Sequence, residues 1–451
     1  MESVDFTEDQ QHIMNASMEG KNIFLTGPGG CGKSFIVKHI VKHAKENNKR
    51  IQVCATTGCA SILLNCGAKT IHSWSGIGVG NMDDNAITTK IMMNTNKRKN
   101  WRNTDILVID EISMMSKRMF ELLNHIGQRV RKDGRPFGGI QLICSGDFFQ
   151  LPPVGKSSDP DSTSFCFESE LWHDVFHEQI LLDKLFRQKD ETYVRVLHQI
   201  REGYLDKKSY DILKNRVIGE CNMEKSIEKY AVYLLPTKQQ AFTMNRKNMD
   251  KIQEPEIKFK SEEITEAAAS SVSTQALPLS TNKKKPSVQQ IKTELSIMYK
   301  GALFENELTL KKGCKVMCIV NLDMEEEIVN GSVGEIIGFN TGSEKQEPIV
   351  RFQNGITKTI YYHSWNSESI PGVCIKQIPL ILAWGITIHK AQGATLDTAV
   401  IDLGRNVFES GQSYVALSRV KSLSGLYLTS FDATKIKANP KVKSFYELFY
   451  E

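Results

Sequence analysis

A glycine-rich segment, GPGGCGKS at residues 27–34, has the residue types and spacing of a loop that binds phosphate groups. Its glycines would let consecutive backbone N–H groups approach phosphate oxygens without clashes from Cβ atoms. Lys33 would neutralise the β- and γ-phosphates of a nucleotide, and the Ser34 hydroxyl would hold a magnesium ion. The residues assigned to this nucleotide site are Gly27, Gly29, Gly30, Cys31, Gly32, Lys33 and Ser34.

Two adjacent carboxylates, Asp110 and Glu111, follow an apolar run farther along the chain. Asp110 would join Ser34 in holding the magnesium ion, and Glu111 would orient and deprotonate an attacking water molecule. Alone, such a pair would usually be an ordinary strand end. Because it accompanies the glycine-rich segment, it predicts hydrolysis of a nucleoside triphosphate. A small-molecule kinase would carry both motifs too, but such a kinase is usually shorter than this chain of 451 residues.

The flanking sequence supplies the elements that must position these groups. Residues 21–26 are typical of a short buried strand, and Ile36, Ile40 and Ala44 recur every four residues, as on one face of a helix. The glycine-rich segment therefore joins a strand to a helix, and the apolar run at 105–110 predicts a second strand. An open parallel α/β sheet binds its ligands at the carboxyl ends of the strands, where we expect both motifs to lie.

Further motifs, in a fixed order along the chain, resemble those of superfamily 1 DNA helicases of the Pif family, in the branch that also holds RecD-like enzymes. The resemblance runs from FTEDQ at residues 6–10 to GQSYVALSR at 411–419, and residues 113–154, which end in GDFFQLPPV, are its most distinctive segment. It implies an α/β fold with two RecA-like P-loop NTPase lobes and a small SH3-like β-barrel insertion in the second lobe. It also implies ATP and Mg²⁺ as cofactors.

The resemblance assigns roles to single residues. Gln10 matches a glutamine that reads the adenine edge, which an amide donor and acceptor can do. Gln150, in GDFFQLPP, matches a γ-phosphate sensor that is joined to the DNA-binding surface. Arg187 and Arg419 match arginines of the opposite lobe that stabilise the transferring phosphoryl group, although each arginine alone would more often lie on the surface. The catalytic candidates are Lys33, Asp110, Glu111, Gln150, Arg187 and Arg419.

Four further segments resemble the motifs that hold single-stranded DNA: CATTGCAS, TIHSWSGIG, LLPTK and AWGITIHKAQGATLD. Hydroxyl, imidazole and amide groups in them can donate hydrogen bonds to phosphates, whereas the ring of Trp74 would either stack on a base or fill core space. The DNA-binding candidates are Thr56, His72, Ser73, Trp74, Thr237, Thr387, His389, Lys390 and Gln392.

The motifs also anchor a prediction of the domains. Short alternating or apolar runs separated by Asn-Gly turns predict a small antiparallel barrel in the second lobe. A segment with few large apolar groups predicts a mobile insertion. The predicted boundaries are 1–183 for the first lobe, with a small excursion at about 75–103; 184–310 and 375–451 for the second lobe, with the insertion at about 260–292; and 311–374 for the barrel.

Composition bears on the partner of the protein and on its compartment. The net charge of +5 is a weak indication of a polyanionic partner. Ten cysteines without a Cys-x-x-Cys pair indicate neither a disulfide framework nor a zinc ribbon, and they favour a reducing compartment. The sequence contains no run of about 18 apolar residues, so we expect no membrane span. The acidic first ten residues lack the patterns of a signal peptide and of a transit peptide, so we expect neither. We expect an intracellular protein of the nucleus, the cytoplasm or a viral factory.

The combined expectation is an ATP-dependent DNA helicase that moves along single-stranded DNA and unwinds single-stranded and forked DNA substrates. The resemblance, and no residue by itself, implies 5′ to 3′ polarity. We expect a monomeric motor with possible partners in replication, repair or recombination. Two alternatives stay open. The chain would be a RecD-like subunit or ATP-gated DNA-binding module that needs a partner for unwinding, or it would be a motor directed at RNA.

Overall fold

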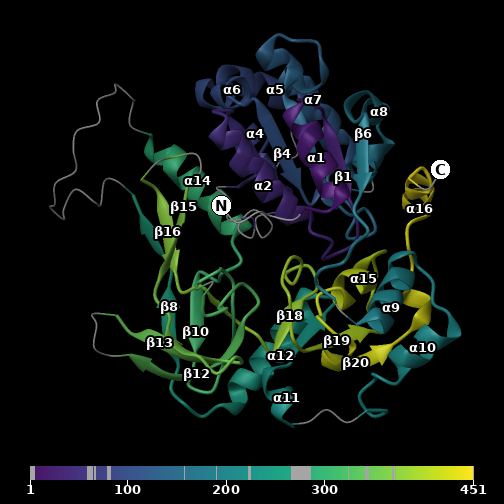
Figure 1. Ribbon diagram of the computed structural model, residues 1–451. Helices are drawn as coiled ribbons and strands as arrows, with labels where there is room; N and C mark the ends of the chain where they lie inside the picture. The colour runs from purple at the N-terminus through teal and green to yellow at the C-terminus, as the bar shows by residue number, and fades with distance from the viewer. Residues whose placement is uncertain are drawn as a thin grey trace. The chain divides into compact units, whose positions relative to one another are not determined.

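The computed structural model forms two compact units, one of Met1–Lys238 with Thr387–Glu451 and the other of Gln239–Ile386 (Figure 1). The residues that the structure describes are 6–57, 64, 68–78, 83–156, 158–188, 190–221, 225–265, 286–323, 325–340, 345–367, 370 and 372–449. Within these ranges, no helix is long and apolar enough to cross a membrane.

The first unit contains a six-stranded sheet whose strands are all parallel, in the order β3-β2-β4-β5-β1-β6. Its strands are β1 (Ile23–Thr26), β2 (Ile51–Ala55), β3 (Lys69–Thr70), β4 (Ile106–Asp110), β5 (Gln141–Gly146) and β6 (Glu178–Leu181). The register pairs Thr26 with Gly146 and Ala55 with Asp110, so the carboxyl ends of the central strands lie at one edge. The strands predicted on both sides of the site are therefore present.

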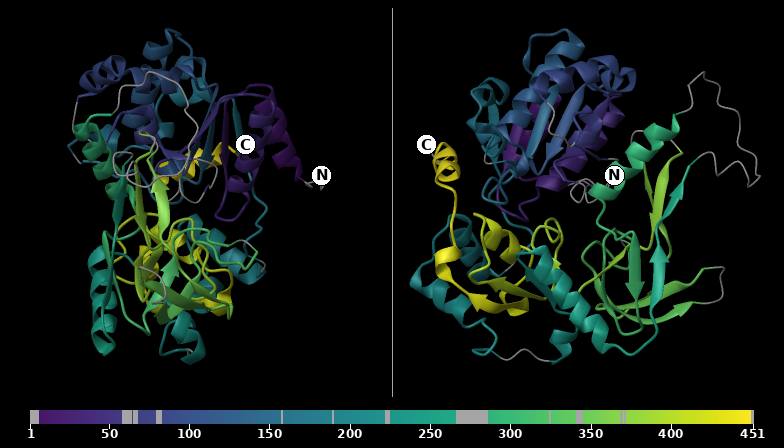
Figure 2. Two further views of the ribbon diagram at one scale, coloured as in Figure 1. Left: turned by 90° about the vertical axis from the view of Figure 1, so that its left-hand side faces the viewer. Right: turned by 180° about the vertical axis from the view of Figure 1, so that it is seen from behind.

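Helices cover both faces of this sheet (Figure 1, Figure 2). On one face, α1 (Glu8–Met18) and α2 (Lys33–Glu46) pack with Ile23 and Leu25 of β1 in a buried cluster. On the other face, Phe24 contacts Trp172 of α8 (Leu171–Val175), and that ring contacts Phe120 of α7 (Lys117–Arg131). The alternation along β1 gives each face its own apolar layer.

The predicted excursion at 75–103 is helical where the structure describes it. It contains α5 (Asp84–Met93) and α6 (Thr95–Arg102), and it follows α4 (Ile71–Ser75). The indole of Trp101 donates a hydrogen bond to the carbonyl of Ser75 at 3.1 Å, which fixes α6 against α4.

The second sheet has the order β18-β7-β19-β20, and β7, β19 and β20 are parallel. Its strands are β7 (Val232–Leu235), β18 (Gly385–Thr387), β19 (Ala399–Leu403) and β20 (Leu426–Phe431). The helices of this region are α9 (Glu191–Arg201), α10 (Lys207–Lys214), α11 (Lys225–Tyr230), α15 (Gln412–Leu417) and α16 (Pro440–Glu447). Two parallel sheets with helices confirm the predicted α/β class.

The described residues of the first unit also contain short 3-10 helices. They are η1 (Ile112–Met114), η2 (Pro136–Gly139), η3 (Pro160–Ser162), η4 (Cys166–Glu168), η5 (Leu423–Gly425) and η6 (Ala433–Lys435).

In the described residues, the second unit contains antiparallel strands and the helices α12 (Lys238–Lys251) and α14 (Val288–Gly301). Five strands pair in the order β14-β13-β12-β11-β17, three in the order β15-β16-β9, and β8 pairs with β10. The bounds are β8 (Ile257–Lys260), β9 (Glu262–Ile264), β10 (Glu307–Leu310), β11 (Lys315–Cys318), β12 (Val333–Asn340), β13 (Glu347–Phe352), β14 (Thr357–Thr359), β15 (His363–Asn366), β16 (Cys374–Gln377) and β17 (Leu380–Leu382).

The compact second unit is larger than the barrel predicted at 311–374, because β8 and β9 from the predicted second lobe pair with β10 and β16. Residues 266–285, the central part of the insertion predicted at 260–292, lie outside the described residues. The lobe boundaries stay a prediction.

Candidate active site

The glycine-rich segment forms the loop between β1 and α2, at the carboxyl edge of the first sheet. Two of its glycines are required by their surroundings. Gly27 has φ +143°, and a Cβ atom there would lie 2.1 Å from the carbonyl oxygen of Leu182. Gly30 has φ +94°, and a Cβ atom there would lie 2.6 Å from the Cβ of Arg187. The loop can therefore keep its path only without these side chains.

Lys33 lies at the start of α2, and its ammonium group points back into the loop. Its Nζ donates to the carbonyl oxygens of Gly27 at 2.7 Å and Pro28 at 3.0 Å. Ser34 is exposed in the first turn of the helix. Cys31 is buried, and its backbone N–H donates to the carbonyl of Pro28 at 3.3 Å. Charge and backbone donors are thus concentrated at a helix amino terminus, which suits a phosphate chain.

The two carboxylates end β4. Asp110 is buried and accepts a hydrogen bond from the hydroxyl of Ser145, on the neighbouring strand β5. Burial raises the pKa of Asp110, although the hydrogen bond from Ser145 acts in the opposite direction. Glu111 has φ +53°, a left-handed conformation whose cost is on the order of 1–3 kcal/mol for a residue with a side chain. Burial, and then the charge of Asp110, raise the pKa of Glu111 to about 7.

Glu111 is also held by two residues that the sequence assigned to DNA. The hydroxyl of Thr56 donates to the Glu111 carbonyl at 2.8 Å, and Nε2 of Gln392 donates to Glu111 Oε2 at 3.2 Å. Gln392 is buried, with 8% of its surface exposed. The structure therefore brings Thr56 and Gln392 to the predicted catalytic base, a contact that their motif positions did not predict.

Both predicted arginine fingers face the glycine loop. A Cβ atom on Gly29 would lie 3.4 Å from Nη2 of Arg419, and Arg187 packs against Gly30 as described above. Both guanidinium groups contact Ser418: Arg187 Nη1 donates to its carbonyl at 3.1 Å, and Arg419 Nη2 donates to its hydroxyl at 2.7 Å. Burial, and then the positive charge of Arg187, lower the pKa of Arg419 to about 10. Two like charges held beside a loop of N–H donors fit a polyphosphate ligand.

Phe186 is a site residue that the sequence reasoning missed. Its backbone N–H donates to the carbonyl of Gly30 at 2.9 Å, and its ring is half exposed. A Cβ atom on Gly32 would lie 3.4 Å from this ring and 3.0 Å from Nε2 of Gln10. An open aromatic face therefore lies beside the predicted adenine-reading amide, and the position of Phe186 directly before Arg187 was the available signal.

Gln150 lies four residues after β5, in a tightly held loop. Its N–H donates to the carbonyl of Asp147 at 2.9 Å, and a Cβ atom on Gly411 would lie 2.5 Å from the Gln150 carbonyl oxygen. The side chain is 5% exposed, yet its Oε1 accepts no hydrogen bond from the described residues. A buried acceptor without a partner costs about 1–3 kcal/mol, so this amide is poised for a donor that the loop itself does not supply.

Three of the first-lobe DNA candidates, His72, Ser73 and Trp74, lie on α4, whereas Thr56 directly follows β2. The pKa of His72 is lowered by burial, and the carbonyl of Ser73 accepts a hydrogen bond from Lys97 at 2.6 Å. Trp74 is 2% exposed, and its ring centroid lies 4.6 Å from that of Trp101. Of the two roles that the sequence left open for Trp74, the structure favours filling core space, because α6 covers the ring. Its contact with DNA stays a prediction.

The second-lobe DNA candidates lie at strand ends. Thr237 follows β7, and Thr387 ends β18, where its hydroxyl accepts a hydrogen bond from the N–H of Lys390 at 3.2 Å. His389 is partly buried, and burial followed by the charge of Lys238 lowers its pKa. Their contacts with DNA stay a prediction.

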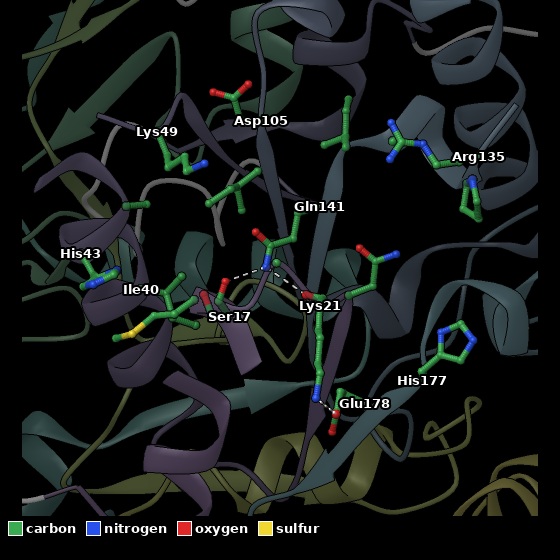
Figure 3. Close-up of a pocket in the computed structure, with 18 of the residues that line it drawn as sticks. Ser17, Lys21, Ile40, His43, Lys49, Asp105, Arg135, Gln141, His177 and Glu178 are labelled. Atoms are coloured by element: carbon green, nitrogen blue, oxygen red, sulfur yellow. Dashed lines mark hydrogen bonds and ion pairs between the residues drawn. The ribbon is translucent and has the colours of Figure 1, made fainter. Parts of the chain in front are cut away.

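A hollow of about 850 Å³ lies at the opposite, amino-terminal ends of the strands (Figure 3). Two of its polar groups have partners within it: Lys21 pairs with Glu178 at 2.8 Å, and Nε2 of Gln141 donates to two backbone carbonyls at 2.9 Å. We assign the chemistry to the carboxyl edge, where the loop, the carboxylates and the arginines converge.

Comparisons with known proteins point to one family. A family model described as PIF1-like helicase matches residues 5–210, and one described as DNA helicase Pif1, 2B domain matches residues 296–339. Human ATP-dependent DNA helicase PIF1 is 33% identical over 443 residues, which cover 98% of this chain and 63% of the human protein. The chain thus spans less than two thirds of that relative.

Two solved structures are similar over nearly the whole chain. Pif1 helicase from Candida albicans is 31% identical with a TM-score of 0.76, and the match covers 99% of this chain and all of that chain. Pif1 from a Bacteroides species, in complex with ADP-AlF4, is 25% identical with a TM-score of 0.77, and the match covers 99% of this chain and 98% of that chain.

Proposed function

This chain belongs to the PIF1-like helicase family, and on that premise we propose that it is an ATP-dependent DNA helicase. The observation that carries the proposal is the convergence of Arg187 and Arg419 on the glycine loop that Lys33 closes. A site whose cationic groups come from distant parts of the chain can link hydrolysis to movement between those parts.

The site residues divide the chemistry among them. The loop N–H groups and Lys33 would bind the phosphate chain, and Arg187 and Arg419 would stabilise the charge that develops during phosphoryl transfer. Glu111, with a pKa of about 7, would accept a proton from the attacking water at neutral pH. The groups that would hold Mg²⁺ are Ser34 and Asp110. The ion, when bound, neutralises phosphate charge.

We assign DNA as the track, through the candidates of the two lobes. Thr56 and Gln392 connect that track to hydrolysis, because each contacts Glu111 directly. A DNA strand that shifted either residue would change the position of Glu111, the proposed catalytic base. We further propose that the chain moves with 5′ to 3′ polarity and acts as a monomer on single-stranded and forked DNA. It would have partners in replication or repair within a reducing intracellular compartment.

The unwinding assay tests the proposal. We expect the purified chain, with ATP, to separate a duplex that carries a 5′ single-stranded tail and to leave one with only a 3′ tail intact. Activity confined to the 3′-tailed duplex would contradict the polarity. ATP hydrolysis that DNA stimulates without any unwinding would favour a RecD-like subunit or gated binding module, and stronger stimulation by RNA tails would favour an RNA motor.

A second test addresses the aromatic face at Phe186. Phe186→Ala is expected to raise the KM for ATP about three- to tenfold with little change in kcat, since stacking contributes roughly 0.5–1.5 kcal/mol. The matched control is Phe242→Ala, because that ring is also exposed but belongs to α12 in the second unit. An unchanged KM for ATP in steady-state hydrolysis would show that the Phe186 ring does not stack on the adenine.

A further inference from the structure

A buried ion pair joins helix α9 to the segment that contains Gln150. Nη2 of Arg201, the last residue of α9, lies 2.9 Å from Oδ1 of Asp147, and its Nε lies 3.1 Å from Oδ2. The two side chains are 3% and 0% exposed. Burial disfavours the charge of Arg201, but the charge of Asp147 more than offsets this and raises the pKa of Arg201. Such a forked, fully desolvated pair tolerates little change in geometry.

Two aromatic rings fix the guanidinium in place. Cζ of Arg201 lies 4.4 Å from the ring centroid of Phe149 and 4.9 Å from that of Tyr446. Phe149 directly precedes Gln150, whereas Tyr446 comes from α16. The arginine therefore holds the loop at a charged residue and at an aromatic one, on both sides of Phe148.

The same cluster reaches the nucleotide loop. The Tyr446 hydroxyl lies 2.5 Å from Oγ1 of Thr26, the residue before Gly27, and it accepts a hydrogen bond from the N–H of Phe148 at 3.1 Å. Nearby, the Tyr414 hydroxyl accepts a hydrogen bond from the N–H of Gly29 at 2.9 Å. The ends of β1 and β5, which lead into the two loops, are thus connected through one hydroxyl group.

Helix α9 carries these contacts back to the arginine finger. It begins at Glu191, four residues after Arg187, and ends at Arg201. The hydroxyl of Tyr193, in its first turn, donates to the carbonyl of Leu417 at 2.7 Å, which anchors that end near Ser418. Because a helix is a stiff element, we expect a displacement of the Arg187 segment, which precedes its first turn, to be carried to Asp147 at its other end.

We propose that Arg201 is a positioning residue for hydrolysis: it sets the Gln150 loop according to the position of the Arg187 segment. The inference rests on the proposed function, since it concerns the coupling of the same nucleotide site. Arg201 itself lies behind the loop and touches Asp147, Phe149 and Tyr446, so it acts through Gln150 and not on the nucleotide.

The test compares Arg201→Lys, which keeps the charge but loses the fork, with Asp147→Asn and with the double variant. We expect each single variant to lower the kcat of DNA-stimulated ATP hydrolysis by about tenfold, with KM for ATP and affinity for single-stranded DNA changed less than about twofold. The double variant should lose little more than either single one, because both remove one interaction. Arg405→Lys, an exposed arginine, is the matched control.

The outcomes separate this inference from the proposed function. A wild-type chain without DNA-stimulated hydrolysis would contradict the proposed function. Stimulated wild-type hydrolysis with an unchanged kcat in folded Arg201→Lys, or a raised KM alone, would overturn the positioning role. If thermal unfolding shows that Arg201→Lys does not fold, Tyr446→Phe replaces it. That change removes only the hydroxyl and should lower kcat about threefold, and no loss would overturn the inference.

Discussion

Lys33→Ala and Glu111→Gln are each expected to reduce DNA-stimulated ATP hydrolysis by at least about 10²-fold, while DNA binding stays nearly intact. Lys33→Ala removes the ammonium group held at the loop by Gly27 and Pro28. Glu111→Gln keeps the shape of the side chain and its contact with Gln392 but cannot accept a proton. Phosphate release in the presence of single-stranded DNA measures the loss, and fluorescence anisotropy measures DNA affinity.

Lys42→Ala is the control for these two variants, because Lys42 is exposed on the same helix as Lys33. This control variant should hydrolyse ATP at the wild-type rate. If Lys33→Ala kept hydrolysis near that rate, the assignment of the glycine-rich loop to phosphate binding would be wrong. The same result for Glu111→Gln would contradict its assignment as the catalytic base. A loss of DNA affinity equal to the loss of hydrolysis would instead indicate a general folding defect, which thermal unfolding would detect.

Arg419→Ala should lower kcat by about 10³-fold with a much smaller change in KM, because an arginine finger acts mainly on the charge of the transition state. The guanidinium is already oriented by Val415 and Ser418, so Arg419→Lys should restore little of the activity. Single-turnover hydrolysis at saturating ATP measures the chemical step directly.

The exposed Arg405 provides the control here too, as Arg405→Ala. A raised KM with an unchanged kcat for Arg419→Ala would place the arginine in ground-state binding and contradict its role as a finger.

The strands and the helix at the carboxyl edge of the first sheet could be predicted because each follows from a local sequence pattern. A strand, a glycine loop and a helix were visible around Lys33, and a second apolar run ended at Asp110. The carboxyl ends of parallel strands share one edge, so the two motifs had to meet. The left-handed backbone of Glu111 was not predictable in this way, because its cost is met by contacts from elsewhere in the fold.

The partners of the site residues escaped prediction because they lie far apart in the chain. Gln392 and Glu111 are separated by 281 positions, and Arg201 and Asp147 by 54. For Trp74, the motif left open whether the ring stacks on a base or fills core space, and only the tertiary contact with the helix carrying Trp101 shows that it is covered. Local sequence shows which side chains are present, whereas tertiary packing decides which of them stay exposed.

The second unit shows the same contrast. Alternating runs and Asn-Gly turns predicted most strands between Lys315 and Asn366, where β11 to β15 lie. The pairing of β8 and β9 with strands from the other side of 266–285 was not predicted, because nothing local indicates which distant strand completes an antiparallel sheet.

The position of α16 has a consequence for synthesis. Thr26 and Tyr446, whose oxygens lie 2.5 Å apart, are separated by 420 positions, and the Phe445 ring of the same helix packs on Phe24. The aromatic face of the first sheet is therefore incomplete until residues 440–447 leave the ribosome. While the rest of the chain is made, that face exposes apolar rings, so the newly made first sheet depends on late residues to become resistant to aggregation.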